Sequence, residues 1–302
     1  MNTTTLQMQT VLFHNDVSHL MRSLEYLANA LEVARRQGWD IALRVVYGDA
    51  SSQPLFTPEQ IAATQEKYRD AFTFTYEFFH ENTGTAKGHN RMAAMSDTEY
   101  IMIMNPDIVV GPRTLLNLLA PFQGEQGSKV AMTEARQTPV EHPKAYDPKT
   151  LETAWASTAC TIIRRKCFDE VQGFDAETFF MYCDDLDFSW RLRLNGYKLI
   201  YCPDAVVFHD KSIDHHGRWQ TTKAERRFSA EASILLAHKW SRPRLRDQII
   251  RNYEEEGEPD GLFAVESYRK RAQEGRLPKP IDPLHRIADF SEDGYGAMRF
   301  TL

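Results

Sequence analysis

The apolar run from Tyr100 to Met104 constrains the fold of this chain most strongly, because it ends at a polar turn that carries a carboxylate, Asn105-Pro106-Asp107. A short, unbroken apolar run is typical of a strand that is covered on both faces. In open α/β sheets, ligands bind beyond the carboxyl ends of such strands. We therefore expect Asp107 to lie at a ligand crevice, with an ordinary turn as the simpler interpretation of Asn-Pro-Asp.

Strands and helices alternate over the first third of the chain. Strands are predicted over 9–14, 41–47 and 72–79, and helices over 17–36, 58–69 and 85–95. This alternation predicts an α/β fold with a parallel sheet and right-handed crossovers. The sequence contains neither a dinucleotide fingerprint of the form Gly-x-Gly-x-x-Gly nor a phosphate-loop motif, so a phosphate ligand would require a metal.

The predicted elements downstream of Asp107 are less regular. Helices are predicted over 115–122, 164–171, 186–194, 222–240 and 262–273, and strands over 159–163, 198–202 and 205–209. The polar stretches 123–127 and 138–149 are predicted to be loops, and the pattern of residues 277–302 indicates no particular structure.

Composition places the chain among globular proteins and excludes some partners. A chain of 302 residues with 42% hydrophobic content can form one α/β domain with an appendage. The formal net charge of −6 argues against a nucleic-acid partner. The four cysteines lack paired spacing, and no signal peptide or membrane span is evident. We therefore expect a cytoplasmic protein, with peripheral contact at the inner face of the plasma membrane left open.

A second acidic group, Asp184-Asp185-Leu186-Asp187, opens the predicted helix 186–194. Three neighbouring acids suit a general base, because like charges raise one another's pKa. A simple charge cluster is the alternative, since the macrodipole favours carboxylates in a first helical turn. This group is the second candidate functional site.

In their order, these features resemble the inverting family 2 glycosyltransferases of the GT-A fold, particularly the bacterial rhamnosyltransferase-like branch. The resemblance covers roughly residues 10–239. Its most specific blocks are Asn82-Thr83-Gly84 through Gly88-His89-Asn90-Arg91 to Asn105-Pro106-Asp107, and Arg164 to Asp175 followed by Phe179 to Arg191. It implies a Rossmann-like GT-A mixed sheet flanked by helices, with a C-terminal helical appendage. The implied domains are a catalytic domain over 1–220, with a nucleotide-sugar half (1–110) and an acceptor half (111–220), and a helical extension and tail over 221–302.

The resemblance implies a Mg²⁺ or Mn²⁺ site. Asn105-Pro106-Asp107 occupies the place of the family's Asp-x-Asp motif, so that Asp107 would bind the metal and Asn105 would contact the donor without adding a charge. His209 matches the family's metal-binding histidine, and His215 and His216 compete for that role. A hard divalent cation suits this reaction, because a departing nucleoside diphosphate develops negative charge.

The resemblance also implies roles for the remaining candidates. Asp185 matches the catalytic base, with Asp184 and Asp187 as supporting acids, and Trp155 falls where the family contacts its acceptor. The implied donor-binding residues outside the metal motif are His14, Asn15, Asp49, Asn82, Gly84 and Asn90. Simpler interpretations are a turn cap for Asp49, a capped helix start for Asn82 to Asn90, and core packing for Trp155.

By its resemblance, the chain is expected to transfer a sugar from a dTDP- or UDP-linked donor to a glycan or lipid-linked acceptor, in bacterial cell-surface polysaccharide synthesis. The first donor expected is dTDP-rhamnose. Alternatives are a UDP-hexose or galactofuranose transferase, and a catalytically weak glycan-binding or scaffold subunit. The basic stretch 222–251 suits contact with anionic lipid, a homodimer face or a solvated packing helix equally well.

Overall fold

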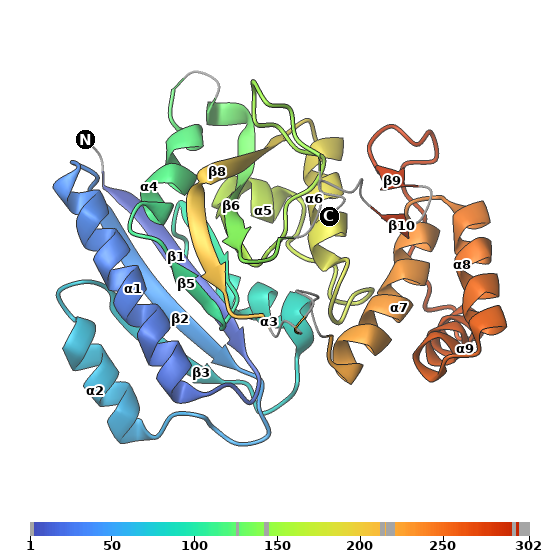
Figure 1. Cartoon of the computed structure of the whole chain (residues 1–302), viewed down its shortest axis with the longest axis horizontal. Coiled ribbons are helices and arrows are strands. Elements are labelled where there is room, and N and C mark those ends of the chain that lie inside the picture. Colours follow the sequence, from blue (N-terminus) through green and yellow to red (C-terminus); the bar gives the residue numbers. More distant parts are fainter. Residues whose placement is uncertain are drawn as a thin grey trace.

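An eight-stranded mixed sheet forms the centre of the molecule (Figure 1). The computed structural model describes residues 3–124, 127–141, 145–211, 215, 221–291 and 294–295. The strand order is β3-β2-β1-β4-β7-β6-β8-β5. The strands are β1 (Thr4–Leu12), β2 (Ile41–Asp49), β3 (Thr73–Phe78), β4 (Tyr100–Met104), β5 (Ile108–Val110), β6 (Val130–Thr138), β7 (Cys160–Arg164) and β8 (Lys198–His209). A separate short pair consists of β9 (Phe290–Ser291) and β10 (Gly294–Tyr295).

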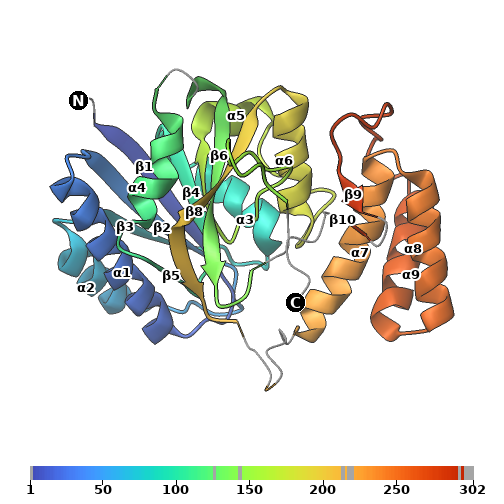
Figure 2. The same ribbon diagram turned by 45° about the horizontal axis from the view of Figure 1, so that its top comes forward.

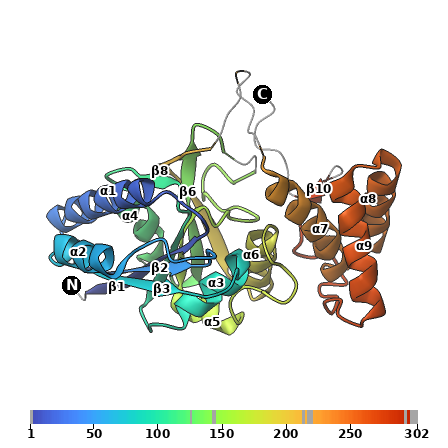
Figure 3. The ribbon, with the colours of Figure 1, turned by 90° about the horizontal axis from the view of Figure 1, so that it is seen from below.

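Helices cover both faces of this sheet. They are α1 (Val17–Arg36), α2 (Pro58–Tyr68), α3 (Gly84–Ala93), α4 (Thr114–Leu119), α5 (Arg165–Glu170), α6 (Asp184–Leu194), α7 (Lys223–Lys239), α8 (Pro243–Glu256) and α9 (Pro259–Gln273). Seen from below, α1 and α2 lie on one side of the sheet and α3 and α5 on the other (Figure 3). The last three helices form a group beyond α6 (Figure 2).

Strand β4 is buried from both sides, as its apolar sequence predicts. Tyr100, Met102 and Met104 belong to a core that includes leucines of α1 and α4. Ile101 and Ile103 point the other way, into a core that includes side chains of α3, α5 and α6. Successive side chains of a strand point to opposite faces, so an unbroken apolar run is needed where both faces are covered.

Only the first half of the sheet is parallel throughout, because in the second half β6 and β8 are parallel and the other neighbouring pairs are antiparallel. Strands β3, β2, β1 and β4 run parallel, which confirms the prediction for the first third of the chain. Strand β7 is antiparallel to both β4 and β6, and β5 is antiparallel to β8. In the last pair, Ile108 lies opposite His209, so the residue after the Asn105-Pro106-Asp107 turn is fixed beside the end of β8.

The helix over 17–36 and the strand over 100–104 have the predicted bounds, whereas β1 begins five residues earlier than the predicted strand start at residue 9. The first half of β1 contains polar residues, so its sequence does not show the apolar pattern of a buried strand. Gln7 and Gln9 are fully buried, and their amides donate hydrogen bonds to the Met92 and His89 carbonyls of α3. Buried amides with partners can replace apolar side chains, which the apolar pattern does not register.

Several elements after Asp107 were not predicted, among them β5, β6, α8 and the short pair of β9 and β10. The two strands predicted over 198–202 and 205–209 form one strand, β8. Its pairing with β6 shifts register between Ala135 and Arg136, where the partner changes from Cys202 to Val206. Pro203 lies in this irregularity, where no ladder hydrogen bond from its nitrogen is required, and β8 therefore continues past a proline. The predicted loop 138–149 includes residues 142–144, which lie outside the described residues.

The C-terminal helices share a core with α6. Helix α7 starts at a capping box in which Thr222 and Glu225 bond each other's backbone N–H groups. Its second half is buried, with Leu236 and Trp240 in one apolar cluster with Leu186 and Trp190 of α6. The basic helix predicted over 222–240 is therefore a packing helix over most of its length. Within the described part of the chain, no helix is both long and apolar enough to cross a membrane.

Candidate active site

One cleft of about 560 Å³ contains both acidic motifs of the sequence. From the sheet, it is lined by Asn105, Asp107 and His209, and we call Asp107 and His209 the sheet side. From the start of α6, it is lined by Asp184 and Asp185, which we call the helix side. Asn15 and Trp155 also line this cleft. The fold thus brings together residues that lie far apart in the sequence.

Asp107 and His209 are paired on the sheet side. Nε2 of His209 lies 3.1 Å from Oδ1 of Asp107. The pairing follows from the antiparallel register of β5 and β8, and the Asp210 N–H donates a hydrogen bond of 2.9 Å to the Asp107 carbonyl. The His209 ring is buried and its Nδ1 lies 2.7 Å from Oε1 of Gln137, whereas the Asp107 side chain is 41% exposed.

This pair fits a divalent cation that is shared with a ligand. A carboxylate oxygen and an imidazole nitrogen are both known ligands of Mn²⁺, and Mg²⁺ accepts carboxylate together with phosphate and water. Within the described residues, no group of three His, Cys, Asp or Glu side chains could enclose a metal. The remaining ligands would therefore come from phosphate oxygens and water. His215 is exposed, and His216 lies outside the described residues.

The helix side depends on a sharp turn before α6. Tyr182 and Cys183 both adopt left-handed backbone conformations, with φ of 67° and 55°. Such conformations are unfavourable for residues with side chains and tend to be kept where function requires them. They direct Asp184 and Asp185 into the first turn of α6.

The two acids of the helix side have different environments. Asp184 is buried, which raises the pKa of its carboxyl group to about 6, although a 2.9 Å hydrogen bond from the Thr85 hydroxyl opposes this rise. Asp185 is only partly buried, and its Oδ1 accepts a hydrogen bond of 2.8 Å from the Leu186 N–H. Asp185 is therefore the more accessible carboxylate of the two.

Asp187 lies outside this cleft. Its side chain is 0% exposed, and it is within 2.7 Å of both Lys239 Nζ and Arg191 Nε. The indole N–H of Trp240 also donates a hydrogen bond to it. Since Lys239 and Trp240 belong to the end of α7, the structure gives Asp187 the task of joining α6 to the C-terminal helices.

The model of the family described as Glycosyl transferase family 2 matches residues 18–187, which include both acidic motifs of the cleft. The chain belongs to glycosyltransferase family 2. It is 35% identical over 95 residues to N-acetylglucosaminyl-diphospho-decaprenol L-rhamnosyltransferase of Mycobacterium tuberculosis, a match that covers 32% of this chain and 28% of the relative. It is 25% identical over 203 residues to rhamnosyltransferase WbbL of Escherichia coli K12, covering 55% of this chain and 75% of the relative. The match thus spans little more than a quarter of the mycobacterial relative, and both relatives support the resemblance to the rhamnosyltransferase-like branch.

Solved structures show the fold of this family 2 glycosyltransferase. GalNAc-T7 with UDP, GalNAc and Mn²⁺ superimposes with a TM-score of 0.60 at 14% identity, covering 91% of this chain and 55% of that one. Mannosyltransferase PcManGT from Pyrobaculum calidifontis, in complex with GDP-Man and Mn²⁺, gives a TM-score of 0.54 at 16% identity, covering 90% and 81%. The GT-A fold predicted from the sequence is confirmed.

Among the predicted donor residues of this glycosyltransferase, Asp49 is engaged by its own loop. It is fully buried, and its carboxylate accepts hydrogen bonds from the Ser51 and Leu55 N–H groups and from the Tyr76 hydroxyl. Its oxygens thus hold the turn after β2, as in a turn cap. His14, in contrast, is exposed and does not line the cleft.

The block from Asn82 to Asn90 connects α3 to the segment before α6. Gly84 has φ of 63°, and a Cβ atom there would collide with the Phe180 carbonyl oxygen, which accepts a 3.0 Å hydrogen bond from the Thr85 N–H. The Asn82 side chain accepts a hydrogen bond from the Gly84 N–H. Asn90 bonds both the N–H and the carbonyl of Phe174. These residues hold protein segments together and do not line the cleft.

The cleft has further lining residues to which the sequence analysis assigned no role, including His89, Lys211 and Tyr182. Burial lowers the pKa of the Lys211 amine, and the nearby Asp107 carboxylate opposes this shift. The Tyr182 hydroxyl donates a 2.8 Å hydrogen bond to Glu225, which also lines the cleft. A lysine two residues after His209 could have been noticed in the sequence, whereas the position of α7 could not.

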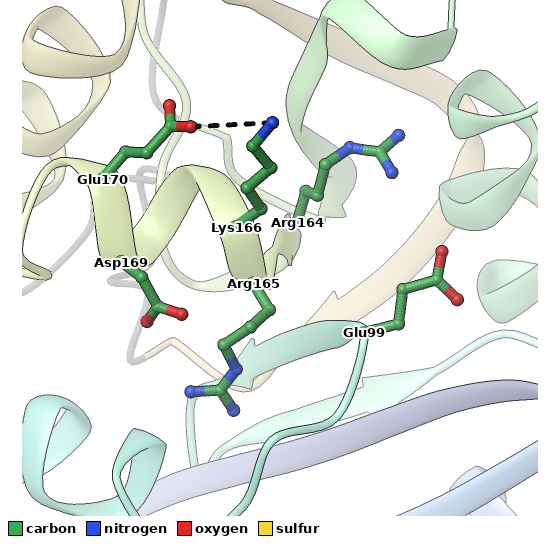
Figure 4. Close-up of a pocket in the computed structure, with 6 residues that line it drawn as sticks. All are labelled: Glu99, Arg164, Arg165, Lys166, Asp169 and Glu170. Carbon is green, nitrogen blue, oxygen red and sulfur yellow. Dashed lines mark ion pairs between the residues drawn. The ribbon is translucent and has the colours of Figure 1, made fainter.

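A second hollow of about 650 Å³ lies beside α5 and is distinct in character (Figure 4). Its two arginines, Arg164 and Arg165, point away from each other. Each donates hydrogen bonds to backbone carbonyls, those of Gly127 and Ala93 among them, and Lys166 is ion-paired with Glu170. These charges hold neighbouring segments in place, so the cleft with the acidic motifs is the candidate active site.

Proposed function

We propose that the protein transfers a sugar from a nucleoside-diphosphate donor to an acceptor hydroxyl in a single inverting displacement. The observation that carries this proposal is one cleft lined by the Asp107–His209 pair and by the accessible carboxylate of Asp185. A leaving diphosphate requires charge neutralisation, and an attacking hydroxyl requires a base. The two sides of the cleft offer groups for these two tasks.

The sheet side is the proposed donor site. Asp107 and His209 would hold Mg²⁺ or Mn²⁺, which when bound neutralises the charge that develops on the leaving diphosphate. Asn105 and Asn15 line the same cleft and offer neutral hydrogen-bonding groups to the donor. Both structural neighbours described above contain Mn²⁺ with a nucleotide or a nucleotide sugar, which supports a divalent cation here.

The helix side is the proposed acceptor site. Asp185 takes the proton of the acceptor hydroxyl, whose oxygen forms the new bond to the anomeric carbon. The bond from that carbon to the diphosphate oxygen breaks, and the electron pair leaves with the diphosphate. Attack from the face opposite the leaving group inverts the anomeric configuration. Trp155 lines the cleft with 7% of its surface exposed, and this exposed part is the proposed contact for an acceptor sugar.

The proposed donor is dTDP-rhamnose and the proposed acceptor is a glycan or a lipid-linked sugar. The name of the mycobacterial relative describes L-rhamnosyl transfer to N-acetylglucosaminyl-diphospho-decaprenol, and that of the E. coli relative describes a rhamnosyltransferase. Both names support rhamnose as the sugar, and the mycobacterial name supports a lipid-linked acceptor. The choice of dTDP as the nucleotide rests on the resemblance to the rhamnosyltransferase-like branch. The proposed domains remain a catalytic unit over 1–220 and a helical extension over 221–302.

Lipid contact is proposed for the exposed part of the stretch 222–251. Lys223, Arg244 and Arg251 are exposed, whereas Arg226 is paired with Asp260. Anionic vesicles should retain the protein at low salt and release it at high salt, because exposed basic residues are screened by ions. Retention that is independent of salt would contradict this contact, and a concentration-dependent dimer in solution would instead indicate the homodimer face.

A panel of nucleotide sugars tests the donor directly. Thermal unfolding is measured with dTDP-rhamnose, UDP-glucose, UDP-galactofuranose and GDP-mannose, each with and without Mn²⁺. A ligand that binds only the folded state raises Tm, so the true donor should raise it most and only with Mn²⁺. A larger response to a UDP sugar would identify the UDP-hexose or galactofuranose alternative, and no response to any donor would contradict the proposed function.

Replacing the carboxylate of the sheet side tests the metal. Asp107→Ala should weaken Mn²⁺-dependent donor binding about 100-fold, because loss of groups that merely orient metal ligands already costs about 10–100-fold. Calorimetry of donor binding with Mn²⁺ measures this loss. Asp70→Ala is the control, since the Asp70 side chain is 95% exposed and Asp70 is not among the residues that line the cleft. Unchanged donor affinity in Asp107→Ala would contradict the metal assignment.

A further inference from the structure

The His209 ring is held from both of its nitrogens. Nε2 faces Oδ1 of Asp107 at 3.1 Å, and Nδ1 faces Oε1 of Gln137 at 2.7 Å. Gln137 is itself buried, with 3% of its surface exposed. It lies near the end of β6, beside β8, where it is paired with Val207 two residues before the histidine. Two adjacent strands therefore fix the distance between amide and ring.

The orientation of the Gln137 amide follows from its own neighbours. Its Nε2 points to the Ser157 hydroxyl oxygen, at 3.5 Å, and that oxygen also accepts a hydrogen bond from the Ala159 N–H. The backbone N–H of Gln137 donates to Glu141. The amide oxygen is thus directed towards the ring. Because an amide oxygen can only accept hydrogen bonds, Nδ1 of His209 donates to Gln137, while Nε2 faces Asp107 Oδ1, which likewise can only accept until a cation is bound.

We propose that Gln137 is a positioning residue that fixes the Nδ1–H tautomer of His209, so that the Nε2 lone pair points to a divalent cation beside Asp107. This inference rests on the proposed function, in which that cation is bound with the donor. Histidines that bind metals commonly donate their other N–H to a carbonyl or carboxylate, which sets the tautomer and the ring orientation. Gln137 supplies such an acceptor from a different strand.

A purely structural role for Gln137 makes a different prediction. If the amide only filled space, an apolar residue of similar length would leave the His209 tautomer and the metal affinity unchanged. If the amide sets the tautomer, Gln137→Met should release the ring, and Gln137→Glu, which keeps an acceptor oxygen, should restore the Nδ1–H form. The pair of variants therefore separates hydrogen bonding from packing.

The first measurement requires no metal. Protein labelled with ¹⁵N-histidine gives long-range ¹H–¹⁵N spectra in which the two tautomers have different nitrogen shifts. We expect a proton on Nδ1 of His209 in the unaltered protein and in Gln137→Glu. In Gln137→Met we expect Nδ1 to lose that proton, because the ring is then held only by Asp107 through Nε2–H. A His209 ring without a proton on Nδ1 in the unaltered protein would overturn the inference.

The second measurement is Mn²⁺ affinity, determined by electron paramagnetic resonance with UDP or dTDP as the probe nucleotide. Gln137→Met should weaken Mn²⁺ binding about 10–100-fold, and Gln137→Glu should recover most of this loss. Gln7→Met is the matched control. Gln7 is a fully buried glutamine whose amide bonds Gln9 and Met92 and does not line the cleft, so Mn²⁺ affinity should stay unchanged.

The outcomes distinguish this inference from the function on which it rests. If the unaltered protein binds Mn²⁺ and Gln137→Met binds it with the same affinity, the role of Gln137 alone is overturned. Unaltered protein that binds no Mn²⁺ with either nucleotide would overturn the metal site of the proposed function and the ligand role of His209 with it. If Gln137→Met does not fold, the proton position on His209 in the unaltered protein and the Mn²⁺ affinity of Gln137→Glu still test the role of Gln137.

Discussion

The sheet side and the helix side of the cleft are built in different ways. Asp107 and His209 are placed by strand register, which allows little freedom because a shift by one residue would turn each side chain to the opposite face. Asp184 and Asp185 are placed by the first turn of α6 and by two left-handed residues before it. The sheet side is thus fixed by pairing between strands, whereas the helix side depends on local contacts around one turn.

The helix side also shows that neighbouring acids can have unrelated tasks. Asp185 lines the cleft, while Asp187 is fully buried between Arg191 and Lys239. On a helix, residues two positions apart point in different directions, so one faces the cleft and the other faces the packed interior. The comparison predicts that substitutions at these two positions will affect different properties.

The largest effect is expected for the proposed base. Asp185→Asn removes the group that accepts the hydroxyl proton and should lower kcat by about 10²–10⁴-fold, the usual contribution of general base catalysis. Nucleotide binding on the sheet side should be retained, which calorimetry with UDP or dTDP and Mn²⁺ would measure. Asp70→Asn controls for loss of a charge. Normal turnover by Asp185→Asn would exclude it as the base.

Asp187→Ala should act on stability. It removes the carboxylate that Lys239 and Arg191 share, although Lys239 keeps its ion pair with Asp175. Removal of one partner of a buried ion pair costs about 3–5 kcal/mol, and we expect a loss at the lower end of this range. Denaturation by urea measures the loss, with Asp70→Ala expected within about 0.5 kcal/mol of the unaltered protein. If Asp187→Ala kept its stability but lost turnover, Asp187 would take part in catalysis. The proposed difference in role between Asp187 and Asp185 would then be wrong.

Gly84→Ala tests the contact between α3 and the segment before α6. The added Cβ would collide with the Phe180 carbonyl oxygen, and overpacking of this kind costs about 1–3 kcal/mol in addition to the left-handed backbone cost of about 1 kcal/mol. Gly38→Ala is a matched control, because Gly38 is also left-handed but has open space around its Cβ position. Equal unfolding free energies for the two variants would contradict a steric role for Gly84.

The smallest effect concerns the buried acid of the helix side. Burial raises the Asp184 pKa from 3.8 to about 6, so the folded state binds this proton more tightly than the unfolded state does. The stability contributed by this group should therefore fall as pH rises from about 4 to about 6 and stay lower above that, by about 2–3 kcal/mol. Asp184→Asn should lack this fall, as the difference in urea unfolding between the two proteins at pH 4, 5, 6 and 7 would show. A constant difference across this range would contradict the raised pKa.

The sequence was sufficient to place most of the cleft but not all of its contacts. Asp107, Asp185 and His209 stand at the ends or starts of regular elements, where local patterns are informative, and the structure puts all three in one cleft. For Asp187 and Asn90, the sequence pattern does not distinguish a packing role from the role of the neighbouring candidate site residues. Their partners, Lys239 and Phe174, lie in other elements, so only tertiary structure assigns them.

The same reason explains which elements could be predicted. Strand β4 could be predicted because its unbroken apolar run is typical of a strand that is covered on both faces. Strand β6 contains Thr133, Glu134 and Gln137, all buried with hydrogen bonds to other segments, and therefore has no simple apolar pattern. The sequence therefore did not reveal β6, whose polar side chains have distant partners, and this strand carries Gln137.

The contact between α6 and α7 gives the protein a built-in optical reporter. The rings of Trp190 and Trp240 are fully buried, with centroids 5.3 Å apart and planes at 83°. Two indoles held this closely and at a fixed angle couple their electronic transitions, which produces a strong signal in near-ultraviolet circular dichroism. Because Trp240 also bonds Asp187, this signal should follow the attachment of the C-terminal helices to the helix that carries Asp185.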